Sequence, residues 1–193
     1  MNKIIFIAYL TVAVLLFSSF DVQKRAEALQ KAYEEKDYDA FIDAFPDKYE
    51  DFVNIYGYDS KELHILYFFS NDHLEFLFSN DRIIETKVLD KLLSLSNDYV
   101  WQADAVSFVI IETRQLLLEH PKRITEYLSG KSDAEVISFF QMALTCLLPE
   151  DKDYLSEYHK LYDVYTPYPD RIVRLLKVAF ERAKQASEVL IVY

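Results

Sequence analysis

The sequence predicts an all-α fold: an irregular multi-helix bundle or short α-solenoid of about eight to ten helices, preceded by an N-terminal signal segment. Apolar residues recur at helical spacing along most of the chain, and they make up 51% of its 193 residues, enough for a sizeable core. Only two glycines occur, Gly57 and Gly130. Tight hairpins and phosphate-binding loops need more of this residue. The scarcity therefore argues against a P-loop or Rossmann nucleotide site.

Residues 1–20 are typical of an export signal. Lys3 is followed by the apolar run 4–17 and then by two small residues, Ser18 and Ser19. This run is short for a membrane-spanning helix, which needs ~20 residues. We expect residues 1–20 to be a signal peptide, or else an uncleaved N-terminal anchor, and residues 21–193 to form a single all-α domain. The protein is then exported, and periplasmic or associated with the cell envelope.

The first helices follow from apolar periodicity and from helix-ending residues. They are expected as two helices within residues 21–45, then one over 47–57 and one over 60–69. The first two are separated near residues 36–37 and end before Pro46. Gly57 is placed to cap the third at its C-terminus. Asp59 and Glu62 have the spacing of a capping box for the fourth.

The triplet Ser-Asn-Asp occurs three times, each time before an apolar-periodic run. It stands at residues 70–72, 79–81 and 96–98. These residue types accept hydrogen bonds from the free N–H groups at a helix start. We therefore interpret the triplets as helix starts; the alternative is a carboxylate-rich binding site. The helices expected after them cover residues 73–78, 82–95 and 99–120.

The C-terminal half continues the helical pattern. Gly130 closes a short helix, and Ser132 and Glu135 form a second capping-box pattern. The helices expected here cover residues 120–130, 133–148, 151–165 and 170–193. The segments 105–111 and 136–148 are apolar on all sides, which is typical of helices surrounded by other helices. The only cysteine, Cys146, lies in the second of them and is expected to be a buried thiol.

The chain is acidic, with a formal net charge of −11. Such a surface repels nucleic acid and attracts cationic partners. Acids concentrate between residues 33 and 62, where tyrosines are interspersed. Tyrosine beside carboxylate suits a contact with a basic protein surface. The candidate partner-binding residues are Asp39, Asp43, Asp47, Tyr49, Glu50, Asp51, Tyr56 and Tyr58. The alternative is that these tyrosines lie at the edge of the core.

No catalytic signature is present in the sequence. It contains neither a G-x-S-x-G elbow nor an H-E-x-x-H zinc motif, so we expect no enzymatic activity and no cofactor. His64, His73 and Glu75 are the candidates for a metal site, because a helix pair could bring them together. Zinc needs three or four such ligands converging on one point.

Two stretches resemble known proteins. Residues 37–59, "DYDAFIDAFPDKYEDFVNIYGYD", resemble segments of exported, uncharacterised all-helical proteins of Bacteroidales bacteria. Some of those look like immunity proteins that accompany antibacterial toxins. Residues 29–46 resemble the middle of a tetratricopeptide unit, although no second copy follows at a period of about 34 residues. The residues at matching places are Leu29, Tyr33, Tyr38, Phe41 and Phe45.

These observations predict an exported protein-binding module, such as an immunity protein that neutralises a basic toxin through an acidic, tyrosine-rich N-terminal face. The partner is then a cationic protein and not nucleic acid. A membrane is involved only through residues 1–20, if they stay uncleaved. The alternatives are a structural or adaptor protein of the cell envelope and a metal-dependent hydrolase.

Overall fold

The computed structural model describes residues 21–58, 63–97, 105–145 and 154–190. The expected signal segment, the Asp59–Glu62 capping box and Cys146 lie outside these ranges. The described residues form an all-α, multi-helix arrangement, which confirms the predicted fold class. Within them, β-structure is confined to an isolated antiparallel bridge between Tyr58 and Leu63. None of the helices described is long and apolar enough to cross a membrane.

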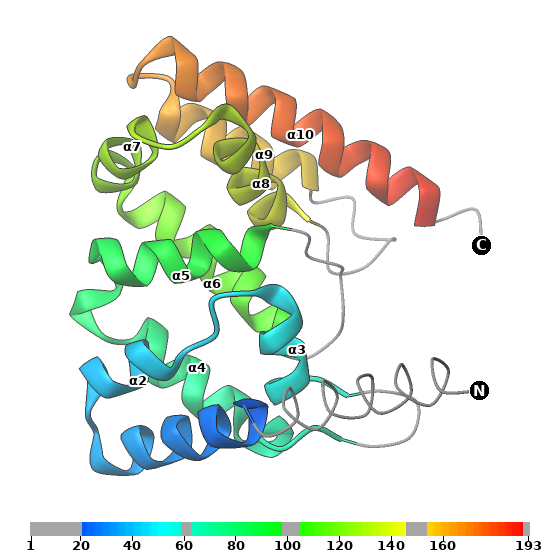
Figure 1. Cartoon of the computed structure of the whole chain (residues 1–193). Coiled ribbons are helices and arrows are strands. Elements are labelled where there is room, and N and C mark those ends of the chain that lie inside the picture. Colours follow the sequence, from blue (N-terminus) through cyan, green and yellow to red (C-terminus); the bar gives the residue numbers. More distant parts are fainter. Residues whose placement is uncertain (1–20, 59–62, 98–104, 146–153, 191–193) are drawn as a thin grey trace, which may run out of the picture.

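The helices succeed one another from one end of the molecule to the other (Figure 1). One end contains a helix over residues 21–35 together with α2 (Tyr38–Ala44), α3 (Tyr49–Tyr56), the short 3₁₀ helix η1 (Tyr67–Phe69) and α4 (Ser70–Phe78). The middle contains η2 (Asp81–Ile84), α5 (Thr86–Ser96) and α6 (Ala105–Glu119). The other end contains α7 (Pro121–Ser129), α8 (Asp133–Leu144), α9 (Tyr154–Tyr165) and α10 (Asp170–Leu190).

Local sequence explains the breaks between the first helices. Lys36 adopts a left-handed conformation with φ of 57°, which stops the helix over residues 21–35. Asp37 then caps α2, because its Oδ1 accepts a hydrogen bond from the Ala40 N–H at 3.0 Å. The helix ends at Ala44, before Pro46. The predicted break and the predicted end are both confirmed.

The predicted helix over residues 60–69 is wrong for its described part. Residues 63–66 are not helical, and only a single 3₁₀ turn, η1, follows them. Their backbone instead pairs with the end of α3: the N–H of His64 donates to Gly57 O at 3.1 Å, and that of Leu66 donates to Ile55 O at 2.9 Å. Hydrogen bonds to residues seven and eleven positions earlier take the place of those of a helix.

The Ser-Asn-Asp triplets have three different roles. Asn80 caps η2, because its side chain accepts from the N–H of Arg82 at 3.0 Å, as the interpretation predicts. The first triplet instead forms the first turn of α4, whose N-cap Phe69 makes no side-chain cap bond. In the third triplet, Ser96 ends α5 and Asn97 is its C-cap, whereas Asp98 and the helix start expected after it lie outside the described residues.

The C-terminal half follows its expected pattern. Ser132 and Glu135 form the predicted capping box, with hydrogen bonds of 2.8 and 3.3 Å between side chains and backbone N–H groups. Helix α8 then ends at Leu144, four residues before the expected Leu148. Helical spacing within residues 170–193 predicts an inward face of six residues on α10, and all six are buried: Ile172, Leu175, Leu176, Ala179, Phe180 and Ala183.

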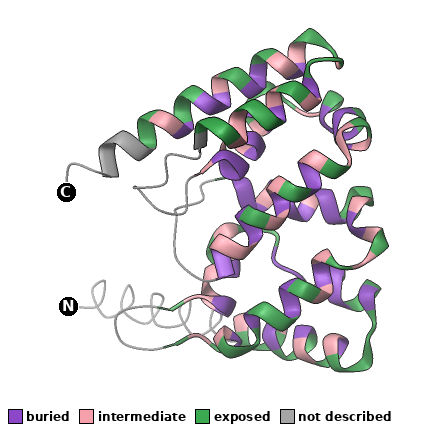
Figure 2. Ribbon diagram, turned by 180° about the vertical axis from the view of Figure 1, so that it is seen from behind, coloured by how far each residue is buried: buried purple, intermediate pink, exposed green. Residues whose placement is uncertain are grey.

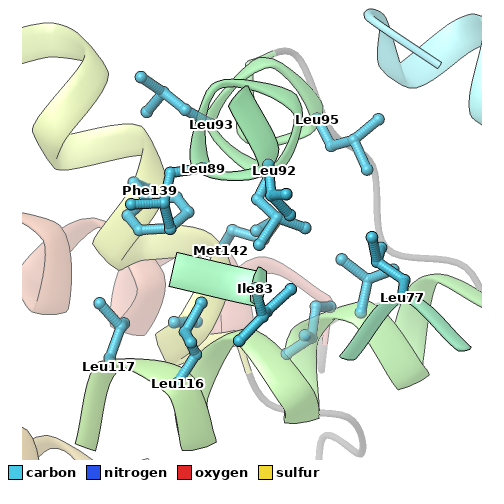
Figure 3. Close-up of a cluster of buried hydrophobic side chains, with 14 of the residues drawn as sticks. Leu77, Ile83, Leu89, Leu92, Leu93, Leu95, Leu116, Leu117, Phe139 and Met142 are labelled. Carbon is cyan, nitrogen blue, oxygen red and sulfur yellow. The ribbon is translucent and has the colours of Figure 1, made fainter. Parts of the chain in front are cut away.

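The core is built around α8, which packs against α5, α6, α9 and α10. Leu92 of α5, Leu116 of α6 and Phe139 of α8 meet in this region (Figure 3). Buried residues occupy the sides that helices turn to one another (Figure 2). The all-round apolar character of α8 is thus explained. The same expectation is wrong for residues 105–111, because Ile111 is exposed.

Candidate partner-binding surface

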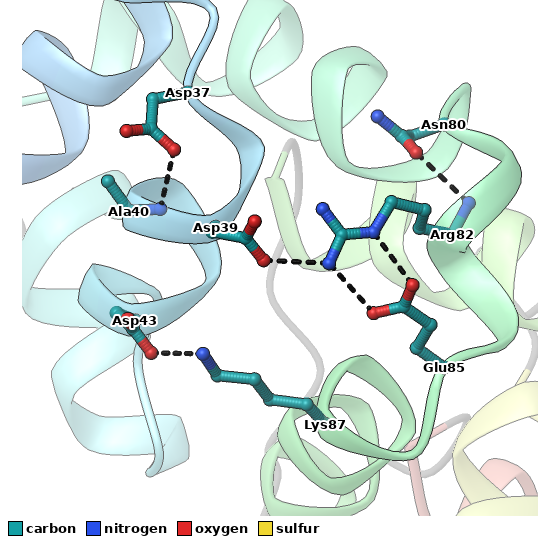
Figure 4. A network of polar contacts seen from close by, with 8 residues as sticks. All are labelled: Asp37, Asp39, Ala40, Asp43, Asn80, Arg82, Glu85 and Lys87. Carbon is teal, nitrogen blue, oxygen red and sulfur yellow. Dashed lines mark hydrogen bonds and ion pairs between the residues drawn. The ribbon is translucent and has the colours of Figure 1, made fainter.

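Three of the predicted acidic residues are used inside the molecule. Asp39 and Asp43 lie on α2, and Asp47 follows it at the same four-residue spacing. Each contacts a basic residue of the η2–α5 region. Asp39 Oδ1 lies 2.7 Å from Arg82 Nη2, Asp43 pairs with Lys87, and Asp47 Oδ1 lies 2.5 Å from Lys91 Nζ. Figure 4 shows the first two pairs. We call these six residues the acid–base row.

Basic partners lower the pKa of two of these carboxylates, Asp39 and Asp47. Hydrogen bonding to Arg82 lowers the pKa of Asp39, and it lowers the pKa of Glu85, to which Arg82 also donates at 2.7 and 3.0 Å. Partial burial alone would raise the pKa of Asp47. The hydrogen bond and charge of Lys91, together with Arg25, outweigh that effect and lower it. Asp39 and Asp47 are therefore ionised at neutral pH.

Lys91 gives the acid–base row a structural role. Its side chain is only 10% exposed, and its ammonium group also donates to the carbonyl of Phe45 at 2.7 Å. This bond satisfies a carbonyl at the end of α2 and ties that end to α5. The remaining pairs are more exposed, and exposed pairs contribute little to stability. The row is consequently not a free anionic face.

Three of the predicted partner-binding residues line one hollow next to the end of α5. Asp47, Tyr49 and Glu50 line a shallow hollow of ~370 Å³ together with Ser94 and Asn97 at the end of α5. Glu50 and Asp51 lie in the first turn of α3, where acids favour the helix dipole. Tyr49 is half-buried against the core. This group therefore has a local structural explanation beside its predicted role in partner binding.

Tyr56 requires a correction, because it is fully buried and cannot touch a partner. Its hydroxyl forms a 3.1 Å hydrogen bond with Nδ1 of His73, which is also fully buried. Aromatic rings surround this histidine: the ring centroids of Tyr33 and Phe69 lie 4.8 and 6.1 Å from the centroid of the imidazole. Burial lowers the pKa of His73 to about 4, so the imidazole is neutral at neutral pH.

Other tyrosines also serve the core. The hydroxyl of Tyr38 donates to Leu77 O at 3.1 Å, and that of Tyr165 donates to Leu117 O at 3.2 Å. Both side chains are buried. In these cases the tyrosine spans from the apolar core to a backbone carbonyl. Part of the high tyrosine content is therefore structural, as the alternative interpretation proposed.

The three candidate metal ligands do not converge. His64 contacts the carbonyl of Val53 through Nδ1 at 2.6 Å, and His73 is enclosed in the aromatic core. Glu75 is exposed on α4. Across the part of the chain that the structure describes, no three His, Cys, Asp or Glu side chains gather in a way that could hold a metal ion. The proposed combination of these residues is therefore wrong.

Exposed apolar side chains are concentrated in the segment that begins with the remaining predicted residue, Tyr58. Among the described residues, five of the seven large hydrophobic side chains that are exposed lie between residues 58 and 69. They are Tyr58, Leu63, Ile65, Phe68 and Phe69, which we call the aromatic patch. Phe68 is 81% exposed. The ring of Tyr67 packs between those of Tyr58 and Phe68, with centroid distances of 5.9 and 5.4 Å.

Sequence reasoning missed most of the aromatic patch. Leu63, Ile65, Phe68 and Phe69 belong to the helix expected over residues 60–69, which gave no indication that they are exposed. The signal was the run 63–69, "LHILYFF", in which only His64 and Tyr67 carry polar groups. Such a segment has no polar side to turn to water. It therefore either requires burial on all sides or leaves apolar groups exposed.

Comparisons with protein-family models, with curated proteins and with solved structures found no match. The all-α fold rests on the helices themselves. The resemblances of residues 37–59 and 29–46 remain predictions.

Proposed function

We propose that this chain is a protein-binding module whose partner docks on the aromatic patch. The observation that carries the proposal is the concentration of exposed apolar side chains between Tyr58 and Phe69. Single exposed apolar residues are common on soluble proteins, whereas clusters of them are typical of interaction sites. Aromatic side chains also supply a large share of binding energy at protein interfaces.

The charge of the molecule favours a cationic protein as the partner. The net charge of −11 disfavours nucleic acid and anionic lipid surfaces. Glu34 and Asp72 lie close enough to His73, beneath the patch, to act on it electrostatically. Acids beside an apolar cluster would accelerate association with a basic surface and make it sensitive to salt.

The finer proposal is an exported immunity protein that neutralises a basic toxin. The export-like segment 1–20, the acidic composition and the resemblance of residues 37–59 support it. In this proposal the partner contacts the patch and its acidic surroundings, with Tyr49, Glu50 and Asp51 as further candidate contacts. Asp39, Asp43 and Asp47 would contribute less, because internal bases already neutralise them.

Site-specific photo-crosslinking tests the proposal. A benzoylphenylalanine in place of Phe68 should give a discrete protein adduct in cells that produce the chain. The same group in place of Ile111, an exposed apolar residue outside the patch, is the matched control. Excess unlabelled wild-type protein should suppress the Phe68 adduct, and the Phe68→Ser protein should not.

Equal adducts from both positions, or no protein adduct from Phe68, would contradict docking on the patch. The immunity proposal requires more. The captured partner must be a toxin, the full chain must inhibit it, and Phe68→Ser must weaken that inhibition. A non-toxic partner would overturn the immunity proposal and leave the binding module in place.

A further inference from the structure

A shallow hollow adjoins the aromatic patch. It has a volume of ~310 Å³, and its walls include Ala26, Glu27 and Glu34 of the helix over residues 21–35, with Ile65 and Leu66 opposite. Ile65 is one of the exposed residues of the patch. The hollow is thus a lateral extension of the patch, with an apolar floor and carboxylates at its rim.

The helical wall has a regular surface. Its lining residues fall into two rows at four-residue spacing, one from Ala26 through Gln30 to Glu34 and one from Glu27 to Lys31. Rows of this kind form the ridges and grooves into which a second helix packs. The wall therefore suits a helical segment better than an extended one.

The rim of the hollow carries the carboxylates of Glu27 and Glu34 and the ammonium group of Lys31, which pairs with Glu35 at 3.9 Å rather than with either rim carboxylate. Glu27 accepts a hydrogen bond from Gln23 at 2.7 Å, and Glu34 accepts one from Gln30 at 2.8 Å. Within the described ranges neither forms an ion pair with a lysine or arginine. Seven residues separate them, which is roughly 10 Å along a helix axis.

We infer that the hollow and the aromatic patch together bind a basic amphipathic helix of the partner. Its apolar side chains would cover Ile65 and the floor of the hollow, and basic residues about seven positions apart would meet Glu27 and Glu34. The inference rests on the proposed function and specifies the chemistry of the partner. Charge complementarity selects this occupant, because the apolar floor alone would accept many others.

Peptide titration of the purified full chain tests the inference. The probe is a fluorescent helical peptide of about 18 residues with a leucine stripe and lysines seven positions apart, followed by anisotropy. It should bind, and its affinity should fall about tenfold between low and high salt. A peptide with glutamates in place of the lysines should not bind.

Two matched variants separate a local effect from a general charge effect. Glu27→Gln, Glu34→Gln and Asp72→Asn together should lower the affinity about tenfold. Glu126→Gln, Asp163→Asn and Glu181→Gln together remove the same charge from exposed positions elsewhere and should leave the affinity within about twofold. Equal losses in both variants would overturn the inference. Competition by neutral phosphatidylcholine vesicles that depends on Phe68 would also overturn it, in favour of a lipid surface.

The inference and the proposed function can fail separately. If the lysine peptide does not bind while Phe68 still gives its protein adduct in cells, the basic helix is wrong and the binding module stands. If the adduct is absent as well, both are wrong.

Discussion

The acid–base row and the aromatic patch lie in the same half of the molecule but use carboxylates differently. In the row, Asp39, Asp43 and Asp47 each contact a basic side chain brought up by η2 and α5. Beside the patch, Glu27 and Glu34 accept hydrogen bonds from glutamines. The number of acids therefore does not locate a binding face. Carboxylates without internal counter-charges, next to exposed apolar groups, are the better indicator.

The largest expected effect is on the pH dependence of stability, to which the two regions contribute in different pH ranges. The pKa of His73, beneath the patch, is lowered from 6.5 to about 4. The unfolded chain therefore binds more protons in this range, so stability falls as the pH falls from 6.5 to 4, by about 3 kcal/mol in total. Nearby charges are those of Asp72, Glu34 and Lys36. Urea unfolding followed by circular dichroism measures this slope.

A double variant identifies the source of that slope. Tyr56→Phe with His73→Leu removes both partners of the buried hydrogen bond and should flatten the dependence between pH 4 and 6.5. Asp39 and Asp47 of the acid–base row affect the free energy of unfolding only at lower pH. The pKa values of Asp39 and Asp47 lie below 3.8, so their contribution is lost only as the pH falls below that value. An unchanged slope in the double variant would contradict the assignment to His73.

A smaller effect tests whether the acid–base row is structural. Lys91→Ala leaves the carbonyl of Phe45 with only the long 3.5 Å hydrogen bond from Arg25 and should lower the free energy of unfolding by about 2 kcal/mol. Lys87→Ala removes only an exposed pair and should cost less than about 0.5 kcal/mol. Urea unfolding at neutral pH measures both. Equal costs would show that the burial of Lys91 has no structural consequence.

The smallest effect on stability belongs to the patch. Phe68→Ser exposes no new surface in the core and should change the free energy of unfolding by less than about 0.5 kcal/mol. The same change should lower partner affinity at least about tenfold, because exposed aromatics gain most from burial in an interface. Unfolding and binding titrations of one preparation give both values. A stability loss as large as the binding loss would indicate a structural role for Phe68.

Local sequence determined what could be predicted. Periodicity located the inward face of α10, and adjacent residues revealed the capping box at Ser132 and Glu135. The pairing of Asp39 with Arg82 joins residues 43 positions apart, and no local pattern specifies it. The exposure of Phe68 was missed for a similar reason. The segment before it pairs with the end of α3, seven to eleven residues earlier, and helical periodicity does not specify such a pairing.

Hydrogen–deuterium exchange of the full chain, with and without the captured partner, tests the central claim most directly. Docking on the aromatic patch predicts slower exchange in residues 63–78 and 21–35, with little change in residues 38–47 and 82–91. Slower exchange confined to residues 38–47 and 82–91 would place the partner on the acid–base row and contradict the account.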